Sequence, residues 1–218
     1  MITLKTSLSS LLKNHVFAGG KPYVYVALGD SATEGIGASS KERSFPAIIH
    51  KFLTSKHRKT EYHNLGKRQS PTNWVISDQL KEAVELNPDL ITLSVGANDI
   101  RVKNMPWKFE KNLRFILKTL KANTDATIVI NSIPNFTHTS WVPVYLKPVV
   151  ALAIKRFNQI IEKVAKEENI LFVDLYDQTL LYARTYPEAM ASDNFHPSDF
   201  GYALWANSIL HSLKMSTK

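Results

Sequence analysis

Five short runs of apolar, β-branched and aromatic residues recur along the chain, and several of them end at a glycine. Runs of this length, apolar at consecutive positions, are typical of strands buried on both faces of a parallel sheet. The predicted strands are residues 23–28, 61–65, 90–95, 126–131 and 170–173. The weakest signal of the five is the run at 61–65.

Between these runs, apolar residues recur at three- and four-residue spacing, which is the period of an amphipathic helix. In residues 107–121, for example, Phe109, Leu113, Ile116 and Leu120 fall on one side of the expected helix. The predicted helices are residues 44–56, 74–86, 107–121, 149–168 and 197–213.

Strands and helices therefore alternate, which favours right-handed βαβ units and a parallel sheet covered by helices on both faces. We predict an α/β fold in which residues 21–218 form a single flavodoxin-like domain around a five-stranded parallel sheet. Residues 1–20 carry leucines at helical spacing. We expect them to form an amphipathic segment packed on the body, with attachment to a membrane surface as the alternative.

Composition narrows the class of protein. The chain has 218 residues, 44% of them hydrophobic and 21% charged, which is the composition of a globular protein. It has no cysteine, so disulfides, thiolate metal sites and cysteine nucleophiles are excluded. Neither a signal-peptide core nor an apolar stretch of membrane-spanning length is visible in the sequence. We therefore expect a cytoplasmic protein, or a secreted or surface-associated one if the natural chain is longer than this sequence.

The net charge of +8 is unevenly distributed. Residues 1–125 hold 19 basic and 11 acidic side chains, whereas residues 126–218 hold eight of each. A basic half can attract anionic lipid, acidic substrates or nucleic acid. Because no zinc finger or RNA-binding signature accompanies the basic residues, we do not expect a nucleic-acid partner. Transient contact of this half with a membrane surface is the partner interaction we expect, and the oligomeric state stays open.

The candidate catalytic and binding residues follow the predicted strands. In a doubly wound sheet, ligands bind beyond the carboxyl ends of the strands, where the strand order reverses. The loops 29–31, 64–66 and 96–99 should meet at this edge, and 193–197 can return to it before the last helix.

These loops hold a complete set of groups for acyl transfer, which needs a nucleophile, a base, a residue that orients the base, and oxyanion donors. Ser31 could be the nucleophile, His196 the base and Asp193 its orienting carboxylate. The backbone N–H groups of Ser31 and Gly66 and the side-chain amide of Asn98 could bind the oxyanion. Taken singly, each group has a simpler interpretation as a helix cap, a turn residue or a loop histidine.

The same residues resemble the sequence blocks of the SGNH, or GDSL-type, serine hydrolases. Residues 29–35 are similar to the first block, Gly66 to the second, residues 96–99 to the third and residues 193–197 to the last, in family order. The resemblance implies a three-layer α/β/α fold and a serine-dependent ester or thioester hydrolase of the acylhydrolase or lysophospholipase kind, with no metal or other cofactor. It implies the roles named above for Ser31, Asp193, His196, Asn98 and Gly66. Ala32 departs from the family, which usually has leucine there.

Other classes lack their signatures. The chain contains no Gly-x-Ser-x-Gly motif of the classical α/β-hydrolases, no phosphate-binding glycine motif and no His-Glu-x-x-His motif. His50 and His57 are expected to be surface residues. The alternatives are a carbohydrate O-deacetylase on the same scaffold and, in a different class, a non-catalytic flavodoxin-like binding module.

One irregular stretch, residues 132–148, follows the fourth predicted strand and is rich in proline and apolar residues. An irregular connection of this length is uncommon unless it is functional. We expect Phe136, Trp141 and Tyr145 to form part of a wall that binds the acyl chain of a small ester or lipid substrate. The alternative is that the stretch only packs on the body.

Overall fold

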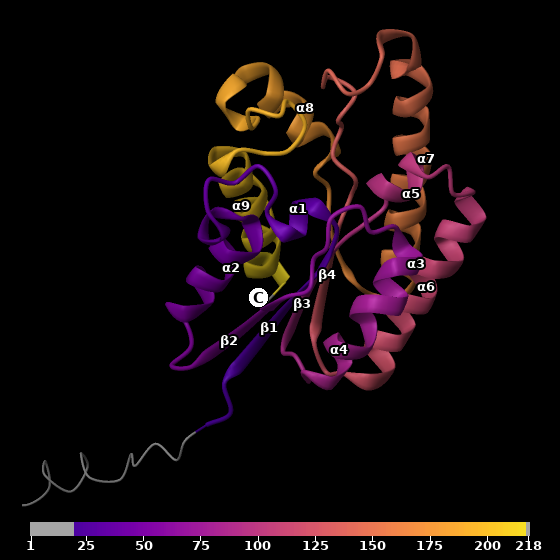
Figure 1. Cartoon of the computed structure of the whole chain (residues 1–218). Helices are drawn as coiled ribbons and strands as arrows, with labels where there is room; N and C mark the ends of the chain where they lie inside the picture. Colours follow the sequence, from indigo (N-terminus) through magenta and orange to yellow (C-terminus); the bar gives the residue numbers. More distant parts are fainter. Residues whose placement is uncertain (1–19, 217–218) are drawn as a thin grey trace, which may run out of the picture.

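The computed structural model describes residues 20–216, and they form an α/β fold around one sheet (Figure 1). The sheet has five parallel strands in the order β2-β1-β3-β4-β5, which confirms the predicted number and direction of strands. The strands are β1 (Tyr23–Gly29), β2 (Thr60–Asn64), β3 (Leu90–Ser94), β4 (Thr127–Asn131) and β5 (Leu171–Val173). The amphipathic segment predicted for residues 1–20 lies outside the described residues except for Gly20.

Side chains alternate between the two faces of the central strand β1. Val24, Val26 and Leu28 belong to one hydrophobic cluster, whereas Tyr25 and Ala27 belong to another. The first cluster is completed by residues of α4 (Leu80–Glu85), α6 (Pro106–Asn123) and α7 (Lys147–Glu167), and the second by residues of α2 (Phe45–Thr54) and α9 (Asp199–Ser216). The sheet is therefore the middle layer of a three-layer α/β/α sandwich, as Figure 1 shows.

Each of the five predicted helices corresponds to a helical segment of the structure. The segments are α2 (Phe45–Thr54), α3 (Thr72–Trp74) with a π-helical turn (Val75–Gln79) and α4 (Leu80–Glu85), α6 (Pro106–Asn123), α7 (Lys147–Glu167) and α9 (Asp199–Ser216). Among the described residues, three α-helices were not predicted: α1 (Ser31–Glu34), α5 (Ala97–Arg101) and α8 (Tyr176–Thr185). The first two are too short to show a period, and α8 has only weak segregation of polar and apolar residues.

The strand order reverses between β1 and β3, whose last residues Gly29 and Ser94 are paired. Gly29 has a φ of +150°, and a Cβ there would stand 2.3 Å from Thr33 Oγ1 and 2.4 Å from the Ser94 carbonyl oxygen. Only glycine fits this position. The tight exit from β1 aims the next two residues, Asp30 and Ser31, over the carboxyl edge of the sheet.

Within residues 20–216, every helix falls short of the length or the hydropathy that a membrane span would need.

Candidate active site

Ser31 is the first residue of α1, and its hydroxyl is not used to cap the helix. The capping residue is Asp30, whose Oδ1 accepts the N–H of Ala32 at 3.1 Å. Glu34, whose spacing of three residues from Ser31 would suit a capping box, instead accepts the Arg68 N–H at 2.7 Å and the Arg68 guanidinium at 2.7 Å. The interpretation of Ser31 as a simple cap is therefore wrong.

Ser31, His196 and Asp193 form a continuous chain of hydrogen bonds. The Ser31 Oγ lies 3.0 Å from His196 Nε2, and His196 Nδ1 lies 2.6 Å from Asp193 Oδ2. The other carboxylate oxygen, Asp193 Oδ1, accepts the backbone N–H groups of Phe195 and His196, both at 2.9 Å. The fold thus joins two segments that are 165 residues apart.

Asp193 is held as a carboxylate by its surroundings. Partial burial raises its pKa, but hydrogen bonds from the His196 ring and from the backbone of His196 and Phe195 lower it, and the net shift is downward. An ionised Asp193 keeps the proton of the neutral imidazole on Nδ1, which leaves Nε2 as the acceptor facing Ser31.

Two contacts anchor the segment that carries Asp193 and His196. Met190 and Pro197 form an antiparallel bridge that closes it into a loop. Trp141, from the connection after β4, donates its indole N–H to the Asp193 carbonyl oxygen at 3.0 Å and packs on Phe195 with ring centroids 5.4 Å apart.

Asn98 enters the site from α5, directly after β3. Its Nδ2 donates to Asp30 Oδ2 at 3.1 Å, and its Oδ1 accepts from Arg101 Nε at 2.9 Å. Arg101 therefore determines which way the amide faces, because its guanidinium can only donate. Burial raises the pKa of Asp30 from 3.8 to about 6.

Asp99, next to Asn98, is buried beneath the site and points away from it. Its carboxylate accepts the Thr72 N–H at 2.9 Å, the Thr72 hydroxyl at 2.7 Å and the Asn104 side-chain amide at 2.8 Å. These bonds tie α5 to the start of α3, as expected of a residue that shapes its loop.

The structure does not place Gly66 where an oxyanion donor is needed. Its N–H donates to Asn64 Oδ1 at 3.0 Å, and Gly66 is not on the wall of the cavity beside Ser31. A Cβ at Gly66 would stand 2.6 Å from the Thr33 side chain, so glycine is required there for close packing against α1. The Gly66 N–H is therefore already engaged with Asn64, away from the cavity wall, and its role as an oxyanion donor stays a prediction.

Gln69, three residues later, does lie on the cavity wall with Ser31 and Asn98. Its φ is +66°, unusual for a residue with a side chain, and its backbone N–H has no acceptor among the described residues. Sequence reasoning missed Gln69 because a non-glycine residue with positive φ leaves no signal in the sequence.

A cavity of about 680 Å³ opens beside Ser31, and Ser31, Asn98 and His196 are on its wall. Its apolar wall comes from the connection after β4 and from α7, α8 and α9 and their flanks, namely Ile133, Phe136, Trp141, Val142, Val150, Leu175, Tyr182 and Leu204. Of the three predicted wall residues, Phe136 and Trp141 are present. Tyr145 is not, because it lies on the turn Val144–Leu146 with 79% of its side chain exposed. The contribution of α8 was not predicted, since that helix itself was missed.

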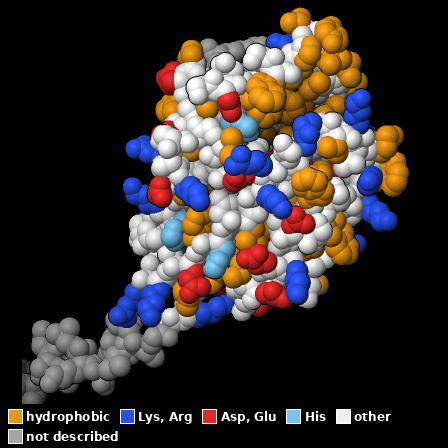
Figure 2. Space-filling view, in the orientation of Figure 1, with side chains coloured by type: hydrophobic (Ala, Val, Ile, Leu, Met, Phe, Trp, Pro, Cys, Tyr) orange, Lys and Arg blue, Asp and Glu red, His pale blue; other side chains and the backbone are white. Residues whose placement is uncertain are grey.

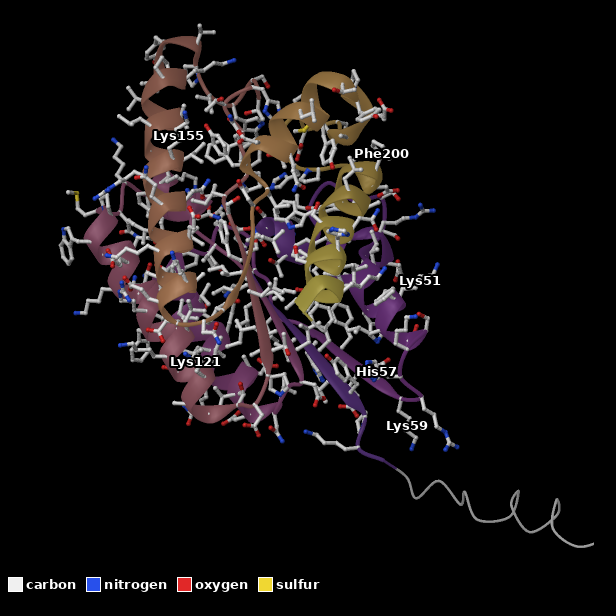
Figure 3. All side chains as sticks on the ribbon, turned by 180° about the vertical axis from the view of Figure 1, so that it is seen from behind. Lys51, His57, Lys59, Lys121, Lys155 and Phe200 are labelled. Carbon is white, nitrogen blue, oxygen red and sulfur yellow. The ribbon has the colours of Figure 1, made fainter. Side chains whose placement is uncertain are left out.

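The two histidines expected on the surface are half-buried and stack on tyrosines. His50 packs on Tyr62 with ring centroids 5.0 Å apart, and His57 packs on Tyr23 at 4.0 Å. In Figure 3 His57 lies at the lower end of the molecule, away from α7's upper end. No cluster of three or more potential metal-ligating side chains occurs within residues 20–216.

A parallel α/β/α sandwich with a serine, a histidine and a carboxylate gathered at the strand-reversal point is the arrangement of a serine hydrolase. Comparison with protein-family models places the chain more narrowly. Residues 27–204 match the GDSL-like lipase/acylhydrolase family, and the chain belongs to that family.

Two curated relatives are similar in sequence. The uncharacterized protein YpmR of Bacillus subtilis (strain 168) is 24% identical over 236 residues, covering 97% of this chain and 89% of its own length. An acetylxylan esterase of Geobacillus stearothermophilus is 25% identical over 144 residues, covering 61% of this chain and 63% of its own length.

Solved structures share the fold. The acetylxylan esterase Axe2 of Geobacillus stearothermophilus superposes with a TM-score of 0.71 at 18% identity, covering 88% of this chain and 94% of its own. An extracellular lipase from Streptomyces rimosus gives a TM-score of 0.67 at 17% identity, covering 87% and 99% of the two chains. These likenesses confirm the three-layer fold and leave the substrate open.

Proposed function

We propose that this esterase hydrolyses carboxylic esters or thioesters of medium-length acyl chains through a covalent acyl-enzyme on Ser31. The observation that carries the proposal is the hydrogen-bonded chain from Asp193 through His196 to Ser31, set on the wall of a large apolar cavity. A non-catalytic binding module would not need these three groups in line.

In the first half of the reaction, Ser31 Oγ attacks the carbonyl carbon while His196 Nε2 accepts the hydroxyl proton. Charge develops on the carbonyl oxygen, and the N–H groups of Ser31 and Gln69 and the second N–H of the Asn98 amide are the proposed donors to it. His196 then protonates the departing alcohol or thiol as the carbon–oxygen or carbon–sulfur bond breaks. Asp193 stabilises the imidazolium in between.

In the second half, water replaces the leaving group. His196 accepts a proton from the water as the water oxygen attacks the carbonyl carbon of the acyl-enzyme. His196 then returns that proton to Ser31 Oγ when the free acid departs. The net reaction consumes one water and needs no other reactant.

The cavity supports an acyl chain longer than acetyl. Its volume lies within the range of sites that hold whole small molecules, and most of the side chains on its wall are apolar. Arg101 and Lys103 are also on the wall. They favour a leaving group that carries negative charge, so a lysophospholipid or an acyl thioester is a suitable natural substrate.

The second candidate is a carbohydrate O-deacetylase. It is favoured by the similarity in sequence to an acetylxylan esterase. A sugar substrate is usually held by polar side chains. The cavity wall carries some, among them Arg68, Gln69 and Asn135, but the greater part of its side chains is apolar.

A chain-length series separates the two. Each buried methylene contributes about 0.8 kcal/mol, so at half that yield kcat/KM should rise about three- to fourfold for every two carbons until the cavity is filled. We expect octanoyl esters to be hydrolysed with a higher kcat/KM than acetyl esters. Faster hydrolysis of acetylated xylo-oligosaccharides than of p-nitrophenyl octanoate would favour the deacetylase.

The nucleophile is tested separately. We expect Ser31→Ala to abolish turnover and a fluorophosphonate probe to label Ser31. Failure of the probe to label Ser31 would remove the proposed nucleophile.

A further inference from the structure

We propose that the protein docks on anionic lipid bilayers through an apolar ridge formed by Trp141, Val144, Tyr145, Leu146, Val149 and Leu152. The ridge lies beside the cavity that holds Ser31. This surface deepens the proposed function, because it would present the cavity to lipid substrates.

The ridge is exposed although its side chains are large and apolar. Val144 and Tyr145 are each 79% exposed, Leu152 is 70% exposed and Val149 is 64% exposed. Figure 2 shows hydrophobic side chains gathered over the upper end of α7, where this segment lies. Scattered exposed apolar residues are ordinary, but a contiguous group of this kind marks an interaction surface.

The ridge continues into the cavity. Trp141 and Leu146 belong to both, and Val150 of α7 faces the cavity while its neighbours Val149 and Leu152 face outward. A lipid chain leaving a bilayer could therefore pass to Ser31 along apolar surface. Continuity of this kind would not be needed if the ridge only bound a second protein.

The charges around the ridge select an anionic partner. Residues 126–161 contain no aspartate or glutamate, but they contain Lys147, Lys155 and Arg156. Arg156 lies on the same side of α7 as Val149 and Leu152, because the three are spaced three and four residues apart. Basic side chains flanking apolar and aromatic ones, here Trp141 and Tyr145, are typical of peripheral contact with a bilayer surface.

This location differs from the one expected from charge alone. The excess of basic residues in the first half of the chain includes Lys51 and Lys59, and Figure 3 shows both below Lys155, with Lys59 at the far lower end. The bilayer would meet the end of the molecule that carries the cavity and not the end that carries Lys59.

Vesicle sedimentation tests the proposal without depending on turnover, because Ser31→Ala can serve as the parent protein and leaves the lipids intact. We expect the full chain to bind vesicles of phosphatidylcholine with about 30 mol% phosphatidylglycerol more tightly than vesicles of pure phosphatidylcholine. Added salt should weaken this binding. Val149→Glu with Leu152→Glu should reduce binding at least about tenfold, since two apolar side chains no longer enter the interface. Lys155→Glu with Arg156→Glu should also reduce it at least about tenfold.

Two matched controls should bind like the parent. Phe115→Glu changes an apolar residue of α6 that is 53% exposed, outside the ridge. Lys51→Glu with Lys59→Glu changes the same charge as the α7 pair at the other end of the molecule. With Ser31 restored, the Val149 and Leu152 variant should hydrolyse a water-soluble ester at the rate of the unaltered chain, which shows that it is folded.

Three outcomes would overturn the proposal. The protein could fail to bind anionic vesicles at low salt. It could also bind them equally well after the Val149 and Leu152 changes and after the Lys155 and Arg156 changes. The ridge changes could also convert a dimer to a monomer in sedimentation velocity without any vesicle binding, which would assign the ridge to a second copy of the chain. If the protein bound vesicles as expected but hydrolysed no ester, the proposed function would be contradicted and the docking surface would not.

Discussion

At the scale of single residues, the amide of Asn98 is held from both ends before any substrate arrives. Arg101 occupies its oxygen and Asp30 takes one of its N–H groups, so the remaining N–H has a defined direction. Pre-set donors of this kind act mainly on the transition state, because the charge that they bind develops only there.

Replacing Asn98 with alanine should therefore lower kcat by about 10²–10³, equivalent to about 2.7–4 kcal/mol, with a much smaller change in KM. Steady-state kinetics on a single ester measures both constants, and circular dichroism controls for folding. A change confined to KM would assign Asn98 to ground-state binding.

At the scale of secondary-structure elements, the π-helical turn between α3 and α4 positions the residue before the Asp30–Ser31 turn. Gln79, at the end of that turn and buried, accepts the Gly29 N–H through Oε1 at 2.9 Å and donates through Nε2 to the Gly29 carbonyl at 2.8 Å. A π-helical turn carries its side chains on a different spacing from an α-helix, and such turns are frequent near functional sites. The end of β1 is thus held by a side chain 50 residues away.

Gln79→Leu keeps a similar size but leaves the buried Gly29 N–H without an acceptor. We expect it to lower the free energy of unfolding by about 1–3 kcal/mol and to reduce kcat, because Ser31 loses part of its support. Gln159→Leu, an exposed position on α7, is the matched control and should change neither. Urea unfolding with parallel kinetics gives both quantities, and an unchanged stability of Gln79→Leu would contradict the role.

At the scale of the whole molecule, two carboxylates of the site, Asp30 and Asp193, should make opposite contributions to the way the free energy of unfolding changes with pH. The folded-state pKa of Asp30, about 6, lies above its ordinary 3.8, so the folded protein binds more protons than the unfolded chain between these values. Its contribution to stability falls as the pH rises through this window. The lowered pKa of Asp193 has the opposite effect, since its stabilisation is present above the ordinary carboxyl value and is lost as the pH falls.

The Asp30 effect amounts to about 3 kcal/mol across the window. Relative to the parent protein, Asp30→Asn should therefore gain about 2–3 kcal/mol of stability on going from about pH 4 to about pH 8, because the amide does not titrate. Comparing the two proteins at each pH cancels all other titrating groups. An offset that is the same at both values would mean that Asp30 keeps an ordinary pKa in the folded state.

The sequence by itself determined the layered fold and most of the site, because both are encoded in local patterns. Apolar runs and helical periods reflect burial within one element, so all five strands were predicted to within one or two residues at each end. The doubly wound order places the ends of β1 and β3 together, and this brought Ser31 and Asn98 to the same edge. The spacing of Asp193 and His196 likewise reflects a single short loop.

Only the tertiary structure decided the features that depend on contacts between distant segments. Gly66 and Gln69 belong to one loop, but which amide is left free depends on Asn64 and on the packing of Thr33 from α1. The outward position of Tyr145, the cavity wall supplied by α8 and the hold of Gln79 on Gly29 have the same origin. None of these leaves a local pattern, because each depends on how segments lie against one another, which is fixed only once the chain has folded.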